Sequence, residues 1–120
     1  MLVSPVPVNP GQHKLDSWSG FTVDRAWLHS QVTGLRNIVV VSGDCHWGSI
    51  ALPPLSFLPE MNIPQLNQGF SNTCGSGQVW TINSTKADHG FGMLTLTPTT
   101  AKFEIINADG SLRMSTIVTK

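Results

Sequence analysis

The stretch NIVVVSGDCHWG, residues 37–48 of the 120-residue sequence, decides the interpretation of the fold. Its first part, Ile38–Val41, is apolar and β-branched at every position. Such a run is typical of a central, parallel strand that is covered on both faces. The polar residues and glycine of Ser42–His46 follow at once. We therefore expect them at the carboxyl end of a buried strand, where open α/β sheets bind their ligands.

An amphipathic helix is predicted just upstream of this strand. Thr22 is a suitable N-cap, and Gly34 is placed to end the helix. Five apolar residues recur at helical spacing and are expected to share one side: Val23, Trp27, Leu28, Val32 and Leu35. A helix that leads into a buried strand indicates a layered α/β fold. Residues 1–20, rich in Pro, Gly and Ser, predict an extended segment with a short strand within Leu2–Val8.

The pattern changes downstream of the strand. Residues 53–78 contain four of the eight prolines, which predicts a long irregular excursion with at most a short strand or helical turn. From residue 79 onward apolar and polar residues alternate, which predicts antiparallel strands. These are Val79–Ile82, Met93–Thr97, Lys102–Asn107 and Leu112–Thr119. Asp109-Gly110 predicts a two-residue type I′ hairpin turn between the last two strands.

Composition and charge exclude several classes of function. Seven Lys and Arg residues balance seven Asp and Glu residues and are scattered, which argues against nucleic-acid or anionic-membrane binding. The apolar runs are far shorter than the roughly 20 residues that span a bilayer, so no membrane span is expected. The first eight residues contain two prolines and no basic residue, which does not fit a secretory signal. The sequence leaves the compartment open.

Asp44 and His46 are the strongest candidates for chemistry. If the backbone stays extended through both, their side chains share one face and lie about 6.6 Å apart. A carboxylate and an imidazole at this spacing suit one metal ion or two neighbouring ions, and Gly43 would let the backbone turn sharply. The same residues also fit an ordinary strand-ending turn, in which Asp44 hydrogen-bonds the backbone and His46 packs beside Trp47.

Four segments, in this order, resemble the C-terminal part of alkaline phosphatase D-like (PhoD-like) metallophosphatases of the calcineurin-like metallophosphoesterase superfamily. They are Asp16–Phe21, the helix containing Arg25, Asn37–Trp47 with its Gly-Asp-x-His signature, and His89–Gly92 before a strand. The resemblance implies the C-terminal portion of a layered α/β/β/α sandwich. One helix and a buried strand would be followed by antiparallel strands, with residues 1–120 forming a single, incomplete domain.

The resemblance also implies a function. Asp44 and His46 would be metal ligands and catalytic residues of a phosphoesterase, with Gly43 as the hinge that presents them. Two or more metal ions, of Fe, Ca, Zn or Mn, would polarise the phosphoryl oxygens of a phosphate ester and activate water for attack. Members of the family are often extracytoplasmic.

The family's N-terminal metal ligands have no counterpart upstream of residue 43. A dinuclear centre needs more than two protein ligands, so we expect the missing N-terminal part, or self-association, to complete the domain. Two alternatives remain: a non-catalytic fragment that needs a partner to complete its fold, and a small binding module without metal.

His89 and Trp47 are weaker site candidates that could contact the metal ligands or the substrate. For His89 the alternative is a surface histidine in a tight turn. Trp47, like Trp18 and Phe91, also fits a packing role at the end of a sheet. Cys45 is expected to point away from the site as a small buried hydrophobe, although a thiol there could bind a soft metal.

Overall fold

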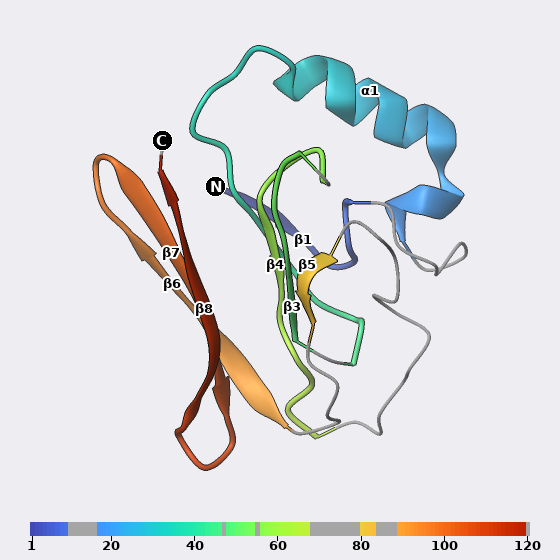
Figure 1. Ribbon diagram of the computed structural model, residues 1–120. Coiled ribbons are helices and arrows are strands. Elements are labelled where there is room, and N and C mark those ends of the chain that lie inside the picture. The colour runs from blue at the N-terminus through green and yellow to red at the C-terminus, as the bar shows by residue number, and fades with distance from the viewer. Residues whose placement is uncertain (10–16, 47, 55, 68–79, 84–88, 120) are drawn as a thin grey trace.

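The computed structural model describes residues 1–9, 17–46, 48–54, 56–67, 80–83 and 89–119, with residues 80–83 described for their backbone only. In these residues a five-stranded sheet, sheet A, lies between helix α1 and a three-stranded sheet, sheet B (Figure 1). The elements are β1 Leu2–Ser4, the 3-10 helix η1 Trp18–Gly20, α1 Thr22–Val32, β2 Val40–Ser42, β3 Ser49–Ala51, β4 Glu60–Asn62, β5 Trp80–Asn83, β6 Gly90–Leu96, β7 Thr100–Asn107 and β8 Leu112–Thr119. The predicted α/β class is confirmed.

Sheet A has the strand order β1-β2-β4-β3-β5. Strands β1, β2 and β4 run parallel, while β3 runs antiparallel to both β4 and β5. The prediction that the apolar run forms an interior, parallel strand is confirmed, although β2 begins and ends later than expected. The predicted strand near residue 80 also exists as β5, but it joins sheet A instead of the strands that follow it. Strand β3 was not predicted, and β4 is a short strand within residues 53–78, where at most a short strand or helical turn was expected.

Sheet B consists of β6, β7 and β8, which pair antiparallel in sequence order and confirm the three predicted strands. β6 starts at Gly90, earlier than the alternation indicated. A Cβ atom at Gly90 would lie 2.3 Å from the carbonyl oxygen of Ile106, so only glycine allows the strands to approach here. The close approach explains why the strand begins in a segment without alternating side chains.

The hairpin between β7 and β8 is present, but the predicted type I′ turn is wrong. Gly110 has a φ of 85°, whereas Asp109 has no positive φ, and a type I′ turn needs both. The backbone N–H of Gly110 donates to the carbonyl of Asn107 at 2.9 Å. The Asp109 carboxylate accepts hydrogen bonds from the N–H and hydroxyl of Ser111, at 2.8 and 2.6 Å. These bonds favour an ordinary turn that Gly110 closes.

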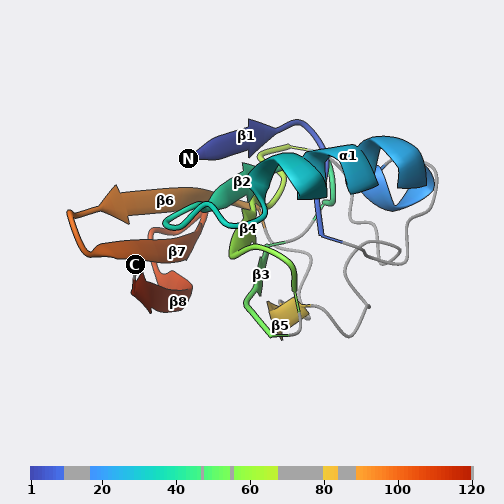
Figure 2. The ribbon, with the colours of Figure 1, turned by 90° about the horizontal axis from the view of Figure 1, so that it is seen from above.

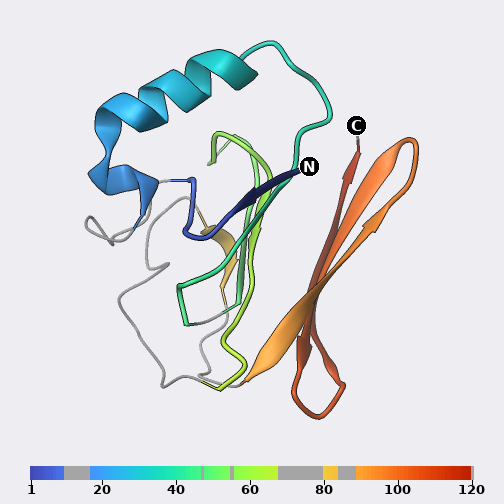
Figure 3. The same ribbon diagram turned by 180° about the vertical axis from the view of Figure 1, so that it is seen from behind.

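The two sheets pack face to face around one apolar cluster. From the side of sheet A it contains Val39, Ile50 and Met61, and from sheet B it contains Ala101, Phe103 and Ile105, all buried. Leu94, Met114 and Val118 of sheet B extend the cluster at its margins. Figure 3 shows sheet A and sheet B side by side from behind, with α1 on the other side of sheet A from sheet B.

A second cluster lies between sheet A and α1, and it uses less of the helix than the sequence predicted. Leu28 is buried and Val32 partly so, whereas Val23, Trp27 and Leu35 are 80%, 62% and 61% exposed. The prediction that all five share the buried side is therefore wrong for three of them. The reason is that only a narrow side of α1, which carries Leu28 and Val32, packs against sheet A. His29, next to Leu28, is exposed, and its ring stacks on that of Phe57 with the ring centroids 3.5 Å apart.

The start and end of α1 follow the sequence only in part. Phe21, rather than the predicted Thr22, occupies the N-cap position, and it makes no side-chain capping bond. Gly34 has a φ of 84°, beyond the last helical residue, so the predicted helix end is confirmed. The packing role of Trp18 is also confirmed. Its ring lies against the second cluster and its Nε1 donates to Ser4 Oγ at 3.2 Å.

The face of sheet B that points away from sheet A, here called the outer face, has no layer over it among the described residues (Figure 2). It carries exposed apolar side chains from β6 and β8: Phe91, Met93, Leu112 and Ile117. The packing role expected for Phe91 is wrong, because alternate residues of β6 point away from the core and its side chain is 45% exposed. No helix in the described residues has both the length and the apolarity needed to cross a bilayer.

Candidate functional site

The polar residues of the predicted site lie at one edge of sheet A. β2 and β4 are parallel and end side by side at Ser42 and Asn62. β3 begins at the same edge, with Ser49 opposite Asn62, and β5 ends there at Asn83. The segment Gly43–His46, here called the strand-end turn, leaves β2 from this edge. Carboxyl ends of parallel strands are the usual place for ligands in α/β sheets.

The backbone of the strand-end turn is not extended, which corrects the geometric premise for Asp44 and His46. β2 ends at Ser42, and the N–H of Cys45 donates to the carbonyl of Gly43 at 2.9 Å. Asp44 lies between them with a φ of 70°. A bond that spans three residues around a positive φ defines a γ-turn, which is rare because the conformation is strained. The separation of about 6.6 Å expected for an extended backbone therefore does not apply.

The side chains of this turn differ in their exposure to solvent. Asp44 is exposed, His46 is partly buried and Cys45 is buried, which confirms the prediction that the thiol behaves as a small hydrophobe turned inward. Gly43 was expected to be the hinge, but it has no positive φ, and a Cβ atom there would make only an ordinary 3.7 Å contact with Pro5. The unusual backbone conformation belongs to Asp44 instead.

A hydrogen bond from Asn62 of β4 holds the strand-end turn in place. Its side chain is fully buried at the end of β4, and Nδ2 donates to the carbonyl of Cys45 at 2.9 Å. A buried amide can donate in this way only if the backbone of the turn keeps its place, because an unpaired buried amide is costly. β4 therefore holds the segment that carries Asp44 and His46.

Glu60, at the other end of the short strand β4, is fully buried and accepts four hydrogen bonds. Oε1 accepts from the backbone N–H of Val8 at 2.9 Å and from Ser42 Oγ at 2.6 Å. Oε2 accepts from the N–H and from the side-chain amide of Asn9, both at 2.8 Å. We call these four residues, Val8, Asn9, Ser42 and Glu60, the Glu60 network. Burial raises the pKa of the Glu60 carboxyl, and the hydrogen bonds from Ser42, Val8 and Asn9 oppose this rise.

The Glu60 network links three segments that are distant in the sequence. Asn9 extends it, since its Oδ1 accepts from the N–H of Phe57 at 2.8 Å and its Nδ2 also donates to the carbonyl of Leu58 at 2.8 Å. The N-terminal segment, the end of β2 and the start of β4 are thus joined by buried polar contacts. Sequence reasoning missed this network, because Glu60 and Asn62 lie in a proline-rich stretch interpreted as an irregular excursion. The available signal was the alternation of polar Glu60, apolar Met61 and polar Asn62, which is typical of a strand.

Among the described residues, two further buried polar groups at this edge have no hydrogen-bond partner. They are the hydroxyl of Ser49 and the side-chain amide of Gln65. Buried polar atoms without a partner are uncommon in folded proteins, and water or a bound molecule often satisfies them. The backbone carbonyl of Gln65 is paired, because it accepts from the N–H of Gly90 at 3.1 Å. This bond ties the exit of β4 to the start of β6.

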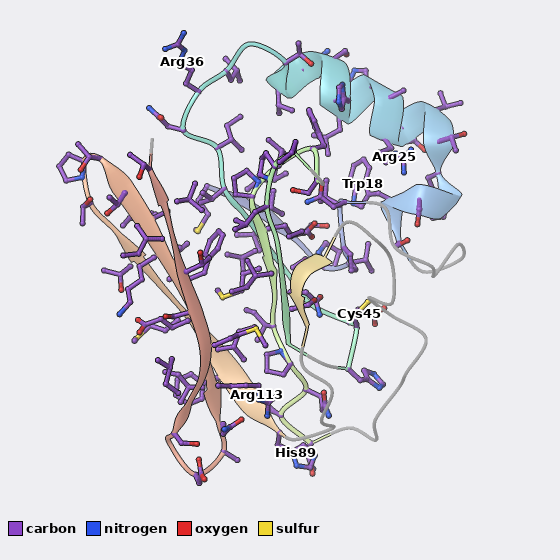
Figure 4. All side chains as sticks on the ribbon, in the orientation of Figure 1. Trp18, Arg25, Arg36, Cys45, His89 and Arg113 are labelled. Atoms are coloured by element: carbon purple, nitrogen blue, oxygen red, sulfur yellow. The ribbon has the colours of Figure 1, made fainter. Side chains whose placement is uncertain are left out.

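His89 is exposed and directly precedes Gly90, so the bond between Gly90 and Gln65 places it near the same edge. Figure 4 shows His89 and Cys45 toward the end of the molecule opposite Arg36. The exposure of His89 fits both a surface histidine and a site residue, and its role stays a prediction. Trp47 lies outside the described residues.

The donor atoms present match a metal in kind but not in number. Carboxylate and imidazole are normal ligands of Fe, Zn and Mn, and a carboxylate also binds Ca. Among the described residues, however, no three His, Cys, Asp or Glu side chains come together closely enough to hold an ion. Asp44 and His46 can therefore form only part of a metal site within the described residues.

Two hollows occur elsewhere in the described residues. One, of about 350 Å³, is lined by Val6, Trp18, Phe21 and Asp24 at the start of α1. The other, of about 290 Å³, lies between residues 35–39, the segment before β4 and the end of β8. Neither hollow is lined by residues of the strand-end turn, so neither is part of the predicted site.

Neither a protein-family model nor a curated protein matches the sequence. Among solved structures, the fold is similar to that of a single-site mutant of Vps29 from Entamoeba histolytica. The similarity covers 81% of this chain and 47% of that chain, at 14% sequence identity and a TM-score of 0.45. This chain thus spans about half the length of that structure. A similarity of this degree says nothing about the reaction, the ligands or the partners of the present chain.

Proposed function

We propose that this chain contributes Asp44 and His46 as two ligands to the metal centre of a phosphate-ester hydrolase. The observation that supports this most is the strand-end turn. A buried parallel strand ends in a strained turn that exposes a carboxylate beside a partly exposed imidazole, and Asn62 holds the turn by a 2.9 Å hydrogen bond. Strain at a non-glycine residue is common where a side chain has a function.

The resemblance of Gly43–His46 to the Gly-Asp-x-His signature supports the same proposal from the sequence. It suggests the metals, Fe, Zn, Mn or Ca, and a phosphate ester as substrate. In such centres bound metals supply the charge that activates water and stabilises the phosphoryl group. Since two ligands do not complete a centre, the remaining ligands must come from outside the described residues or from another copy or segment.

Metal binding by the 120-residue chain tests the proposal directly. Mn²⁺ broadens the NMR signals of nuclei near its site, so we expect titration with Mn²⁺ to broaden the backbone amide signals of residues 43–46 first. Asp44→Ala and His46→Ala should each abolish this selective broadening. His29→Ala is the matched control, because His29 is a histidine on α1 that stacks on Phe57 away from the strand-end turn. Equal broadening in wild-type chain and both site variants would refute the assignment.

Hydrolysis of p-nitrophenyl phosphate by the same samples tests whether the chain completes the centre by itself. Turnover with stoichiometric metal in the wild-type chain, lost in both site variants, would show that no missing segment is needed. Metal binding without turnover is the expected result, since the described residues supply too few ligands.

The exposed apolar residues favour the second candidate, a non-catalytic fragment that needs a partner. The outer face of sheet B and the outward side of α1 together expose large hydrophobic side chains, including Val23, Trp27, Phe91 and Ile117. Surfaces of this kind usually mark contact with another polypeptide. A chain that binds no Mn²⁺ at the strand-end turn would support this alternative.

A further inference from the structure

Strand β8 forms an open edge of sheet B. The strand, Leu112–Thr119, lies at the margin of the strand order β6-β7-β8, and all its residues except Arg113 pair on one side with β7. Among the described residues nothing pairs with its other side. At such an edge alternate backbone N–H and carbonyl groups point outward and can pair with a further strand.

β8 has only one feature by which edge strands usually avoid pairing, and it lies near the start of the strand. It contains no proline, glycine or lysine, and its one charge, Arg113, lies at the register shift against β7 and donates to Asn107 Oδ1. Proline, lysine and bulges are the common means of blocking a free edge. The chain as a whole has a formal net charge of zero, so two copies do not repel each other at long range.

The other edges are less suitable for pairing. β6, the opposite margin of sheet B, contains Gly90 and Gly92, which weaken a strand because they offer no side chain to a partner. β1, at one margin of sheet A, has only three residues. The longest edge without glycine in the described residues is therefore β8.

The side chains of β8 are complementary to those of a second β8 in antiparallel orientation. With a twofold axis at Thr116, Met114 faces Val118 of the partner on the inward side, and both residues pack against the core between the sheets. On the outer face Ser115 faces Ile117, and both are exposed. This register pairs Met114 with Val118, both apolar, and opposes no like charges, which favours cross-strand pairing.

We propose that β8 pairs with β8 of a second copy of this chain, which joins two B sheets into one continuous sheet. The contact is isologous, because each copy presents the same strand, so it closes as a dimer. It is independent of the proposed metal centre, which lies at the edge of sheet A. Backbone hydrogen bonds supply the attraction, as in other cases of strand addition.

Charge substitutions test both the edge and the register. Ser115→Lys with Ile117→Lys places like charges opposite each other across the axis, whereas Ser115→Glu with Ile117→Lys places opposite charges there. Sedimentation equilibrium of the 120-residue chain is expected to show a dimer. The Lys/Lys variant should weaken the dimer at least tenfold, and the Glu/Lys variant should restore it. Within one chain position 115 lies opposite Glu104, where Glu favours folding less than Lys does, so better folding cannot explain a dimer restored in the Glu/Lys variant.

The matched control is Met93→Lys with Thr95→Lys on β6, which are also outward and exposed. This control should leave the dimer unchanged. A wild-type chain that stays monomeric at all concentrations overturns the proposal, as does an equal loss of association in the control. Failure of Glu/Lys to restore the dimer overturns the register and with it the proposed twofold pairing.

Discussion

Sheet B and the Glu60 network are stabilised by different kinds of contact. Sheet B pairs strands that follow each other in the chain, and its inward residues Ala101, Phe103 and Ile105 are fully buried among apolar neighbours. The Glu60 network joins residues that are 52, 51 and 18 positions apart by hydrogen bonds to one buried carboxylate. One region depends on apolar area, and the other on the alignment of four donors.

The difference decides how each region responds to change. An apolar core loses stability in proportion to the volume removed, because its contacts are many and individually weak. A buried polar network loses stability when a single member is removed, because the remaining donors stay buried without partners. The strand-end turn depends on the second kind of region, since both Ser42 and Asn62 border it.

The largest effect is expected at the centre of sheet B. Phe103→Ala removes a fully buried ring from the cluster between the sheets and should lower the free energy of unfolding by about 4 kcal/mol. Urea denaturation followed by circular dichroism measures this loss. Phe91→Ala is the control, because Phe91 is 45% exposed on the outer face and should cost much less. Equal losses would mean that the outer face is covered.

Glu60→Leu tests the network in the same way. The substitution leaves the donors of Val8, Asn9 and Ser42 buried without an acceptor, and we expect a loss of about 3 kcal/mol. Glu104→Gln is the matched control in sheet B. Its carboxylate pairs with Lys102, which is 42% exposed, so the loss should stay below about 1 kcal/mol. A Glu60→Leu chain as stable as the Glu104→Gln chain would contradict the network.

The stability of the network should also depend on pH. Burial raises the pKa of Glu60 above its ordinary value of 4.5, so the folded chain holds this proton more tightly than the unfolded chain. The stability that the folded chain gains from this tighter proton binding is complete below pH 4.5. It is lost as the pH rises through the pKa of Glu60 in the folded chain. Urea midpoints from pH 4 upward should therefore fall more steeply for the wild-type chain than for Glu60→Gln. Parallel curves would show that the pKa is not raised.

Sheet B could be predicted from the sequence because its signals are local. Alternation between residues 93 and 119 predicted three strands in their correct order, since each strand pairs with its neighbour in the chain. The turn type at Asp109 was wrong, because its side chain bonds Ser111 and favours a different backbone conformation. The helix was found, and Leu28 and Val32 lie on its buried side as predicted, but Val23, Trp27 and Leu35 do not, because periodicity does not show how much of a helix the sheet covers.

The surroundings of the candidate site could not be predicted in the same way. Asp44 and His46 were found from a short motif after a buried strand, but the γ-turn centred on Asp44 is held by the bond from Asn62 to Cys45, 17 positions apart. The local signal for Glu60, its alternation with Met61 and Asn62, is weak, because a charged residue in a proline-rich stretch is normally expected in a solvated loop. Only the approach of Val8 and Asn9 makes its burial possible.

The smallest effect expected concerns Asp44 itself and separates its backbone from its carboxylate. Its φ of 70° is a conformation that glycine adopts readily and that costs alanine the most strain, so Asp44→Gly should relieve the strain, whereas Asp44→Ala should not. We expect the glycine variant to be more stable than the alanine variant by roughly 1 to 2 kcal/mol, measured by urea denaturation. Both variants lose the carboxylate, so both should lose the selective Mn²⁺ broadening equally. If alanine were as stable as glycine, the turn would not be strained, and the strain could no longer support a functional role for Asp44. If glycine is more stable, the chain gives up stability at this position to keep a carboxylate, which supports the proposed functional role of Asp44.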